Sequence, residues 1–224
     1  MQGYARQMVA GVKHIHLCGV AHLDIKPNNM LVDANNTLKI ADFGLARWTH
    51  LVGSDLSSGT DGYAAPDISN RTSLGLTADI DGLAADVWAL GVTILFLSIR
   101  RNLFARLNLR GDTEPRDAYK MRRRDLYHNM QRWQTKGQGY GLGDDAVLGA
   151  CGTISGLVGS RPVASFIALP HYLKTLLNSM LYIDQARRPT IHEVAASTWI
   201  TGAVPAPTVP APAAPAPGLS LIQI

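Results

Sequence analysis

Cysteine is scarce in this sequence. The two cysteines, Cys18 and Cys151, lie far apart and show none of the close spacing of a metal-binding motif. We therefore expect no disulfide framework, and the reducing cytoplasm is the expected location. Each cysteine is predicted to be a small, buried apolar residue.

Long hydrophobic runs are also lacking. The longest apolar run extends from Val87 to Ile99, which is thirteen residues, whereas a helix that spans a bilayer needs about 20. We predict a buried core helix at this run. The N-terminus lacks the basic-then-apolar order of a signal peptide, so no membrane insertion is expected.

A chain of 224 residues with 46% apolar content fits one globular domain. We predict this domain over residues 1–200, with a divergent insertion at about 100–160. Residues 201–224 form a tail rich in proline and alanine, and the proline spacing favours an extended polyproline-like chain. The tail could bind a proline-recognition module, although a simple unstructured tail is the preferred interpretation.

The densest chemistry lies between His22 and Asn29. A carboxylate (Asp24), an ammonium group (Lys26) and a carboxamide (Asn29) occur within six residues. Pro27 fixes its own φ and disfavours helix at the residue before it. We therefore predict a stiff loop that presents polar side chains. Asx turns or helix caps are the alternative roles for such short polar side chains.

A short β-hairpin is predicted after this loop. Apolar residues 30–32 and residues 38–40 flank a polar turn at 33–36, as in two strands joined by a turn. The hairpin would bring the loop close to Asp42, so that two carboxylates, an amide and a lysine surround a small space. Hard oxygen ligands suit Mg²⁺ and an ammonium group suits phosphate. The presence of Asp42 therefore favours a site over a simple turn.

The loop resembles the protein-kinase catalytic loop H-R-D-x-x-x-x-N, and Asp42-Phe43-Gly44 matches the D-F-G motif of that family. Further elements resemble kinase motifs in the family's order: Gly59-Thr60, Ala65-Pro66-Asp67, Asp86-Val87-Trp88-Ala89-Leu90-Gly91 and Arg188-Pro189-Thr190. Because these motifs keep their order and context, the chain is identified as a member of the protein kinase superfamily over about residues 4–200. Lys26, two residues after the aspartate, resembles serine/threonine kinases more than tyrosine kinases.

The resemblance implies an α+β protein-kinase-like fold, here the mainly α-helical C-terminal lobe with a small β-hairpin. The N-terminal lobe, which supplies a Gly-rich loop, a strand lysine and a helix glutamate in the family, is expected to be missing. Residues 137–143 are Gly-rich but fail G-x-G-x-x-G in every register, so a flexible loop is predicted there.

Three accounts of such a lobe stay open. It could be part of a longer kinase, a lobe completed by a partner chain, or a non-catalytic kinase-like binding or scaffold module. A small-molecule kinase is disfavoured, because Gly59-Thr60 and Ala65-Pro66 resemble a platform for a protein substrate. The retained catalytic motif favours descent from an active enzyme.

The reaction implied by the resemblance is transfer of the γ-phosphoryl group of ATP to serine or threonine hydroxyls of a protein substrate. Asp24 would accept or orient the proton of the substrate hydroxyl. Lys26 would neutralise the transferring phosphoryl group, and Thr60 would bond to the catalytic loop. Catalysis of this kind rests on positioning and charge neutralisation.

The resemblance also assigns the nucleotide and metal ligands. Asn29 and Asp42 would hold Mg²⁺, and Lys26 would contact the phosphates of ATP. Leu31 would support the adenine ring with its apolar side chain. Core packing is the alternative role for Leu31.

Other positions have structural roles by resemblance. His22 and Phe43 would stack as part of an internal spine, for which core packing is again the alternative. Asp86 would bond to the backbone of the catalytic loop, and as the first residue of the apolar helix it would also cap that helix.

Two positions depart from the family pattern. Leu23 replaces the arginine that, in most kinases, pairs with a phosphorylated activation-loop residue, and control by such pairing is therefore not expected. Asp67 replaces a glutamate, and it would still pair with Arg188 through a shorter side chain.

Hydrophobic periodicity and end signals predict the remaining elements. Helices are expected at 4–17, with a stop at Gly19, at 173–181, and at 190–197, where Thr190 and Glu193 would form a capping box. Loops are expected at 47–59 and 68–85.

Positive charge is concentrated between residues 100 and 136. This segment holds eleven of the 21 lysines and arginines against four acidic residues, a net charge of +7 in a chain of net charge +4, so the remainder carries −3. It could dock an acidic substrate segment, nucleic acid or a nuclear-import receptor, the last of which would add the nucleus to the expected locations. A solvated, partly helical insertion is the alternative. Aromatic residues are too sparse here to favour nucleic acid.

Overall fold

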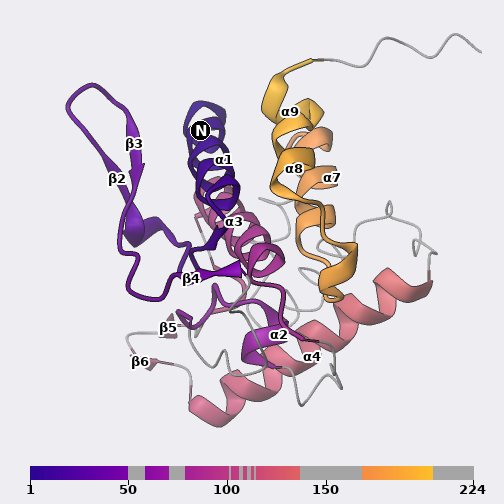
Figure 1. The fold of residues 1–224 in the computed structure, drawn as a ribbon. Helices are drawn as coiled ribbons and strands as arrows, with labels where there is room; N and C mark the ends of the chain where they lie inside the picture. Colours follow the sequence, from indigo (N-terminus) through magenta and orange to yellow (C-terminus); the bar gives the residue numbers. More distant parts are fainter. Residues whose placement is uncertain are drawn as a thin grey trace, which may run out of the picture.

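The computed structural model describes residues 1–49, 59–70, 79–100, 102–105, 108–109, 112–113, 115–136 and 168–203. Within these ranges the helices are α1 (Gln2–Leu17), α2 (Pro66–Ser69), α3 (Gly82–Ile99), α4 (Arg116–Lys136), α7 (His171–Met180), α8 (Ile191–Ala196) and α9 (Thr198–Thr201), with short 3₁₀ turns η1 (Pro27–Asn29) and η4 (Gln185–Arg187). Helices dominate the fold (Figure 1), as predicted.

The strands of the described residues are short and pair as antiparallel two-stranded ribbons. They are β1 (Val20–Ala21) with β4 (Arg47–Trp48), β2 (Met30–Val32) with β3 (Leu38–Ile40), and β5 (Asn108–Leu109) with β6 (Asp112–Thr113). The predicted hairpin is the β2–β3 ribbon, in which Met30 pairs with Ile40. The ribbon projects from one side of the helical body (Figure 1).

Helix α1 has one apolar face, which buries Met8 and Val12 against the core. The helix ends at Leu17, and Gly19 follows with a φ of 72°, a left-handed conformation that glycine adopts without a steric penalty. The N–H of Gly19 donates to the carbonyl of His16 at 2.9 Å. The predicted stop at Gly19 is confirmed.

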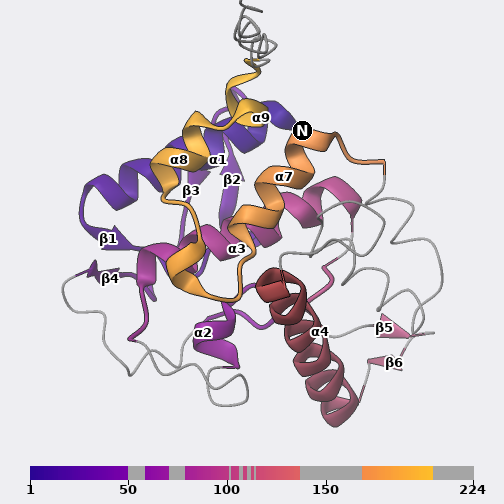
Figure 2. The ribbon, with the colours of Figure 1, turned by 90° about the vertical axis from the view of Figure 1, so that its right-hand side faces the viewer.

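Helix α3 is the central element, against which α1, β1 and α7 pack (Figure 2). Its own side chains are apolar on all sides, so the helix is stable only when other elements of the fold cover it. Among the described helices it is the one whose length and composition would suffice to cross a membrane, and 67% of it is buried within the fold. The predicted buried core helix is confirmed.

The predicted N-cap of α3 is wrong. The helix begins at Gly82, and the side chain of Asp81 caps it by accepting the N–H groups of Leu83 at 2.9 Å and Ala84 at 3.1 Å. Asp86 lies inside the helix and is fully buried. Its tertiary contacts, described below, explain why an aspartate stands within a helix.

The basic segment is helical from Arg116 to Lys136, and this helix is solvated on one face only. Helix α4 buries the apolar side chains on one of its faces in the core: Tyr119, Leu126, Tyr127 and Met130. The ring of Trp88 on α3 lies 5.4 Å from that of Phe104 and 5.8 Å from that of Tyr127. These aromatic contacts hold α4 beneath α2 and α3 (Figure 1).

The C-terminal helices follow the predicted pattern. Helix α7 buries Leu173 and Leu177, and the Thr190 side chain accepts the N–H of Glu193 while the Glu193 carboxylate accepts the N–H of Thr190. The capping box is therefore confirmed. A further short helix, α9, follows α8 and buries Trp199; it was not predicted from the sequence.

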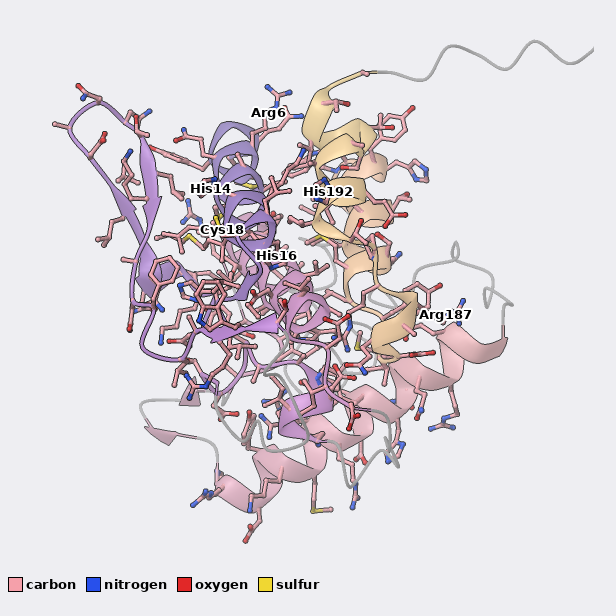
Figure 3. The ribbon with its side chains drawn as sticks, in the orientation of Figure 1. Arg6, His14, His16, Cys18, Arg187 and His192 are labelled. Atoms are coloured by element: carbon pink, nitrogen blue, oxygen red, sulfur yellow. The ribbon has the colours of Figure 1, made fainter. Side chains whose placement is uncertain are left out.

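The first and last helices of the described body are joined. The side chain of Arg6 donates from Nε to the carbonyl of Ile200 at 2.5 Å, and that of Gln2 donates to the carbonyl of Trp199. Figure 3 shows Arg6 reaching from α1 toward α9. These side chains satisfy carbonyl groups at the end of α9 that have no partner within the helix.

Some smaller predictions are wrong or lie elsewhere. The predicted loop at 47–59 begins with strand β4, and the one at 68–85 includes the ends of α2 and α3. Cys18 is exposed at the end of α1, because it follows the last apolar position of the buried face. Cys151, the Gly-rich loop at 137–143 and the tail from residue 204 lie outside the described residues.

Candidate active site

The loop from His22 to Asn29 has a constrained backbone. Leu23 has a φ of 65°, which costs a residue with a side chain roughly 1–2 kcal/mol. Lys26 is extended, with φ −161° and ψ 163°, as the following proline predicts. The chain then turns through η1 into strand β2, so that Asp24, Lys26 and Asn29 are presented on a short, rigid segment.

The buried carboxylate of Asp86 fixes this loop to α3. It accepts the backbone N–H groups of His22 and Leu23, each at 2.7 Å and each on a different oxygen. His16 Nε2 lies 3.0 Å from the same carboxylate, a contact that the sequence did not indicate. Charge-assisted hydrogen bonds of this kind offset the unfavourable conformation of Leu23, and the bonding to the loop backbone expected for Asp86 is present.

Asp24 is the centre of a compact hydrogen-bond network. Its Oδ1 accepts the hydroxyl of Thr60 at 2.6 Å. Its Oδ2 accepts Lys26 Nζ at 2.7 Å and Asn29 Nδ2 at 3.1 Å, and Lys26 Nζ also donates to Thr60 Oγ1 at 2.7 Å. The structure therefore brings together four of the predicted site residues. The Asx-turn or cap alternative is wrong for Asp24, because its carboxylate accepts from side chains.

The environment of Asp24 keeps it ionised. Burial acts to raise its pKa, but the hydrogen bonds from Lys26 and Thr60, with the positive charge of Lys26, outweigh that effect. The pKa of Asp24 therefore lies below its ordinary value. At neutral pH the network contains a carboxylate and an ammonium group in direct contact.

Asp42 lies two residues after the end of strand β3. The N–H of Ala41 donates to the carbonyl of Asn29 at 2.9 Å, so the ribbon places Asp42 next to the residue bonded to Asn29. Asp42 is exposed with a φ of 63°, and its Oδ1 accepts the N–H of Gly44 at 3.3 Å. In the described residues no hydrogen bond joins it to the Asp24 network, so it forms a neighbouring but separate part of the site.

Two predicted apolar contacts are exposed instead of buried. Leu31 is 56% exposed and Phe43 is 49% exposed, so the core-packing alternative is wrong for both. His22 is buried, and its ring centroid lies 4.8 Å from that of Phe43. The two rings are in contact, but they are tilted by 58° and not stacked. The exposed side chains of Phe43 and Leu31 leave apolar surface beside the hairpin.

The donor set at this edge fits a magnesium ion bound with phosphate. Asn29 uses Nδ2 for Asp24, and its Oδ1 accepts no hydrogen bond from the described residues. The carboxylate of Asp42 supplies a second, exposed oxygen donor. Mg²⁺ is commonly held by one or two protein oxygens together with substrate phosphates, and this pair provides them.

Residues 59–70 run from the Asp24 network to α2 and depend on glycine. Gly62 has a φ of 84°, and a Cβ there would lie 2.7 Å from the Cβ of Ala105. Asn102 Nδ2 donates to the Gly62 carbonyl at 3.1 Å. A small pocket beside this segment is lined by Leu23, Asp24, Thr60, Tyr63, Ile68 and neighbouring residues.

The predicted pair of Asp67 and Arg188 is buried and present. The guanidinium of Arg188 donates to the Asp67 carboxylate, to the carbonyl of Tyr182 at 2.7 Å and to that of Ala84 at 3.2 Å. Burial lowers the pKa of Arg188, and the charge of Asp67 opposes that effect. Aspartate in place of glutamate therefore still forms the pair, and the pair joins α2 to the segment before α8.

The sequence did not reveal a second polar cluster beside Thr60. Asp61 pairs with Arg123 of α4 and accepts the hydroxyl of Tyr119, whose pKa is raised by burial and by this hydrogen bond to Asp61. The apolar residues of α4 recur at helical spacing and could have indicated its buried face. The high charge of the segment obscured that pattern.

Comparison with known proteins agrees with this geometry. The family model for the protein kinase domain matches residues 1–200. Mitogen-activated protein kinase kinase kinase 3 of Arabidopsis thaliana is 45% identical over 92 residues, which cover 41% of this chain and 16% of that protein. Serine/threonine-protein kinase STK11 of Mus musculus is 29% identical over 201 residues, which cover 88% of this chain and 35% of that protein.

The matched region is therefore only part of each relative. CBL-interacting serine/threonine-protein kinase 9 of Arabidopsis thaliana is 38% identical over 98 residues, which cover 42% of this chain and 21% of that protein. Motif order, the Asp24 network and the match over residues 1–200 agree. This chain belongs to the protein kinase domain family.

Proposed function

We propose that this chain is the catalytic lobe of a serine/threonine protein kinase, which transfers the γ-phosphoryl group of ATP to a protein hydroxyl. The observation that carries the proposal is the network around Asp24. A carboxylate offers about four acceptor positions, and the bonds from Thr60, Lys26 and Asn29 occupy three of them. The remaining position, on Oδ1, is available to the hydroxyl of a substrate.

The roles of the network follow from its chemistry. Asp24 accepts the proton as the substrate oxygen attacks the γ-phosphorus and ADP leaves. Lys26, whose side chain is 19% exposed, offers its ammonium group to the phosphoryl oxygens. Thr60 positions the side chains of Asp24 and Lys26 by hydrogen-bonding to both. Such a site acts by position and charge.

Nucleotide and metal binding are assigned to the hairpin edge. Asn29 and Asp42 are the magnesium ligands, and Leu31 supports the adenine ring. Bound Mg²⁺ supplies neutralisation of the phosphate charge. The exposure of Leu31 and of the Asp42 carboxylate supports this assignment, because both groups are accessible to a nucleotide.

Activity further requires a second lobe on the hairpin face. Leu31, Val32 and Phe43 are 56%, 49% and 49% exposed, and covering apolar surface contributes about 25 cal/mol per Å². We assign this face to a lobe that carries the Gly-rich loop and the phosphate-binding lysine, from the same protein or from a partner chain. A non-catalytic binding module is less well supported, because it has no use for an ionised Asp24 beside Lys26.

Calorimetric titration of the 224-residue chain with magnesium-ATP tests the nucleotide site. Micromolar binding that Asp42→Ala abolishes supports the assignment, and Asp117→Ala is the control, because it removes an exposed carboxylate from α4. Equal binding by the unaltered chain and Asp42→Ala contradicts the metal role of Asp42. Phosphotransfer by a two-lobed form that is unchanged in Asp24→Asn contradicts the catalytic proposal.

A further inference from the structure

Helix α4 is a rigid platform. Its buried face packs in the core, and Arg122, which is 7% exposed, donates to the carbonyls of Leu103 at 3.0 Å and Ala105 at 2.7 Å. A helix anchored by both apolar packing and buried hydrogen bonds keeps its outward side chains in fixed positions relative to the rest of the lobe.

The N-terminal half of α4 is tied to the segment beside the catalytic network. Arg123 pairs with Asp61, and Asp61 follows Thr60, whose hydroxyl lies 2.6 Å from Asp24. Arg123 also lies over the ring of Tyr119, with 4.8 Å from Cζ to the ring centroid. Arg123 on α4 is therefore linked, through Asp61, to the residue that donates to Asp24.

Three cations on α4 form a regular row that the catalytic site does not use. Arg116, Lys120 and Arg124 are exposed and follow one another at intervals of four residues; we call them the basic flank. Residues four apart lie on the same side of a helix. Figure 3 shows nitrogen-tipped side chains projecting from α4 away from the body.

The spacing of the basic flank matches an extended peptide. Four residues of α-helix advance about 6 Å along the axis. Two residues of extended chain advance about 6.6 Å and return the side chain to the same face. Acidic side chains at every second position of a peptide would therefore meet successive cations of the basic flank.

Exposed acidic residues on α4 compensate this charge only in part. Arg124 Nε lies 3.6 Å from Asp125 Oδ1, and both side chains are exposed, so solvent weakens the attraction within that pair. Asp117 is also exposed. Within a segment of net charge +7, the local field favours an anionic partner.

We propose that the basic flank binds an acidic segment of the protein substrate, with carboxylates at alternate positions and a few residues away from the acceptor hydroxyl. This inference deepens the proposed kinase function and rests on it for the word substrate. Charge and spacing align the acidic segment with the cationic side chains of the basic flank. It steers the acceptor hydroxyl toward Asp24.

A binding assay that needs no phosphotransfer tests the proposal. Fluorescence anisotropy would measure the binding of labelled peptides to the 224-residue chain. In these peptides the acceptor serine is replaced by alanine, and three glutamates stand at alternate positions. Peptides with three consecutive glutamates or with glutamines are the controls. We expect the alternating peptide to bind about tenfold more tightly than the glutamine peptide and more tightly than the consecutive one.

Variants locate the contact. Lys120→Glu/Arg124→Glu should weaken binding of the alternating peptide about tenfold or more, whereas Lys13→Glu/Lys174→Glu, with the same charge change on α1 and α7, should not. Equal affinity for glutamate and glutamine peptides overturns the proposal, and that comparison needs no variant. Equal loss in both double variants also overturns it, because it reports net charge alone.

Two further measurements separate the inference from its foundation. A two-lobed form could bind the peptide through the basic flank and yet show no phosphotransfer. That result supports the site for an acidic segment and contradicts the kinase proposal. Phosphotransfer with the same KM for acidic and neutral acceptor peptides overturns the inference while the kinase proposal stands. Tighter binding of a single-stranded oligonucleotide that displaces the alternating peptide overturns the choice of a protein ligand.

Discussion

The carboxylate of Asp86 accepts the backbone N–H of Leu23 at 2.7 Å, and Leu23 is the residue of the catalytic loop with a φ of 65°. A side chain near the start of the core helix therefore holds an unfavourable backbone conformation one residue before Asp24. The position of the Asp24 carboxylate depends on this buried link between α3 and the loop.

Replacing Asp86 by alanine should both destabilise the fold and reduce phosphotransfer. The N–H groups of His22 and Leu23 would lose their acceptor inside the protein, and an unsatisfied buried group costs roughly 1–3 kcal/mol. We expect the free energy of unfolding in urea to fall by about 3 kcal/mol. Asp86→Asn keeps one acceptor oxygen, so its free energy of unfolding should fall by less. Equal losses in both variants would contradict the arrangement in which each carboxylate oxygen accepts one N–H.

Thr60→Val should lower kcat while the fold is kept. Valine preserves the branched shape but removes the hydroxyl that donates to Asp24 and accepts from Lys26. Misplacement of a catalytic group by a small distance costs about 100-fold in rate, so a fall in kcat of about 10- to 100-fold is expected in a two-lobed, active form. Thr60→Ser keeps the hydroxyl and should stay near the unaltered rate; an unchanged kcat in the valine variant would exclude the role.

The stabilising effect of the Asp24 network should depend on pH with a definite sign. The folded-state pKa of Asp24 lies below its ordinary value, so the unfolded chain binds the proton more readily. The stabilisation is fully present above the unfolded pKa of about 4 and is lost as pH falls through the folded pKa.

Urea unfolding of the unaltered chain and of Asp24→Asn measures this effect. The difference in unfolding free energy should be constant between about pH 6 and about pH 8 and should shrink below about pH 4. A difference that grows toward acid pH would mean that Asp24 has a raised pKa. The phosphotransfer rate should likewise show no acidic limb from Asp24 above about pH 5.

Removing Asp67 should be more damaging than removing the whole pair with Arg188. Asp67→Ala leaves a buried guanidinium without its carboxylate, and breaking a buried pair in this way costs about 3–5 kcal/mol. The double variant Asp67→Ala/Arg188→Met removes the charge as well and should recover part of that loss. Thermal or urea unfolding of the single and double variants gives the coupling energy, and strictly additive losses would contradict the pair.

The helix ends and the hairpin could be predicted because their signals are local. Gly19 ends α1, and Thr190 with Glu193 begins α8, through chemistry contained in three or four adjacent residues. The short motif likewise predicted Asp24 and Lys26 as members of one site. The two residues are only two positions apart, and their side chains are in contact at 2.7 Å.

What the sequence did not predict was decided by distant contacts. Asp81 and Asp86 are equally good caps by residue type, and only the position of the catalytic loop shows that Asp86 belongs inside the helix. The charge of α4 obscured the helical spacing of its apolar residues, and the partners that bury Tyr127, namely Trp88 on α3 and Phe104, are distant contacts that the spacing does not identify.

The bond from Arg6 to the carbonyl of Ile200 spans 194 residues of chain. During synthesis, α1 leaves the ribosome long before α9 exists, so the hydrogen bond between them cannot form until α9 has been made. Closing so long a loop adds little to the equilibrium cost, because that cost grows only with the logarithm of loop length, but contacts of such separation slow folding. Helix α9 therefore completes the packing around the N-terminal end of α1 only after the intervening chain has been made, and a nascent chain halted before α9 would leave Arg6 and Gln2 without these acceptors.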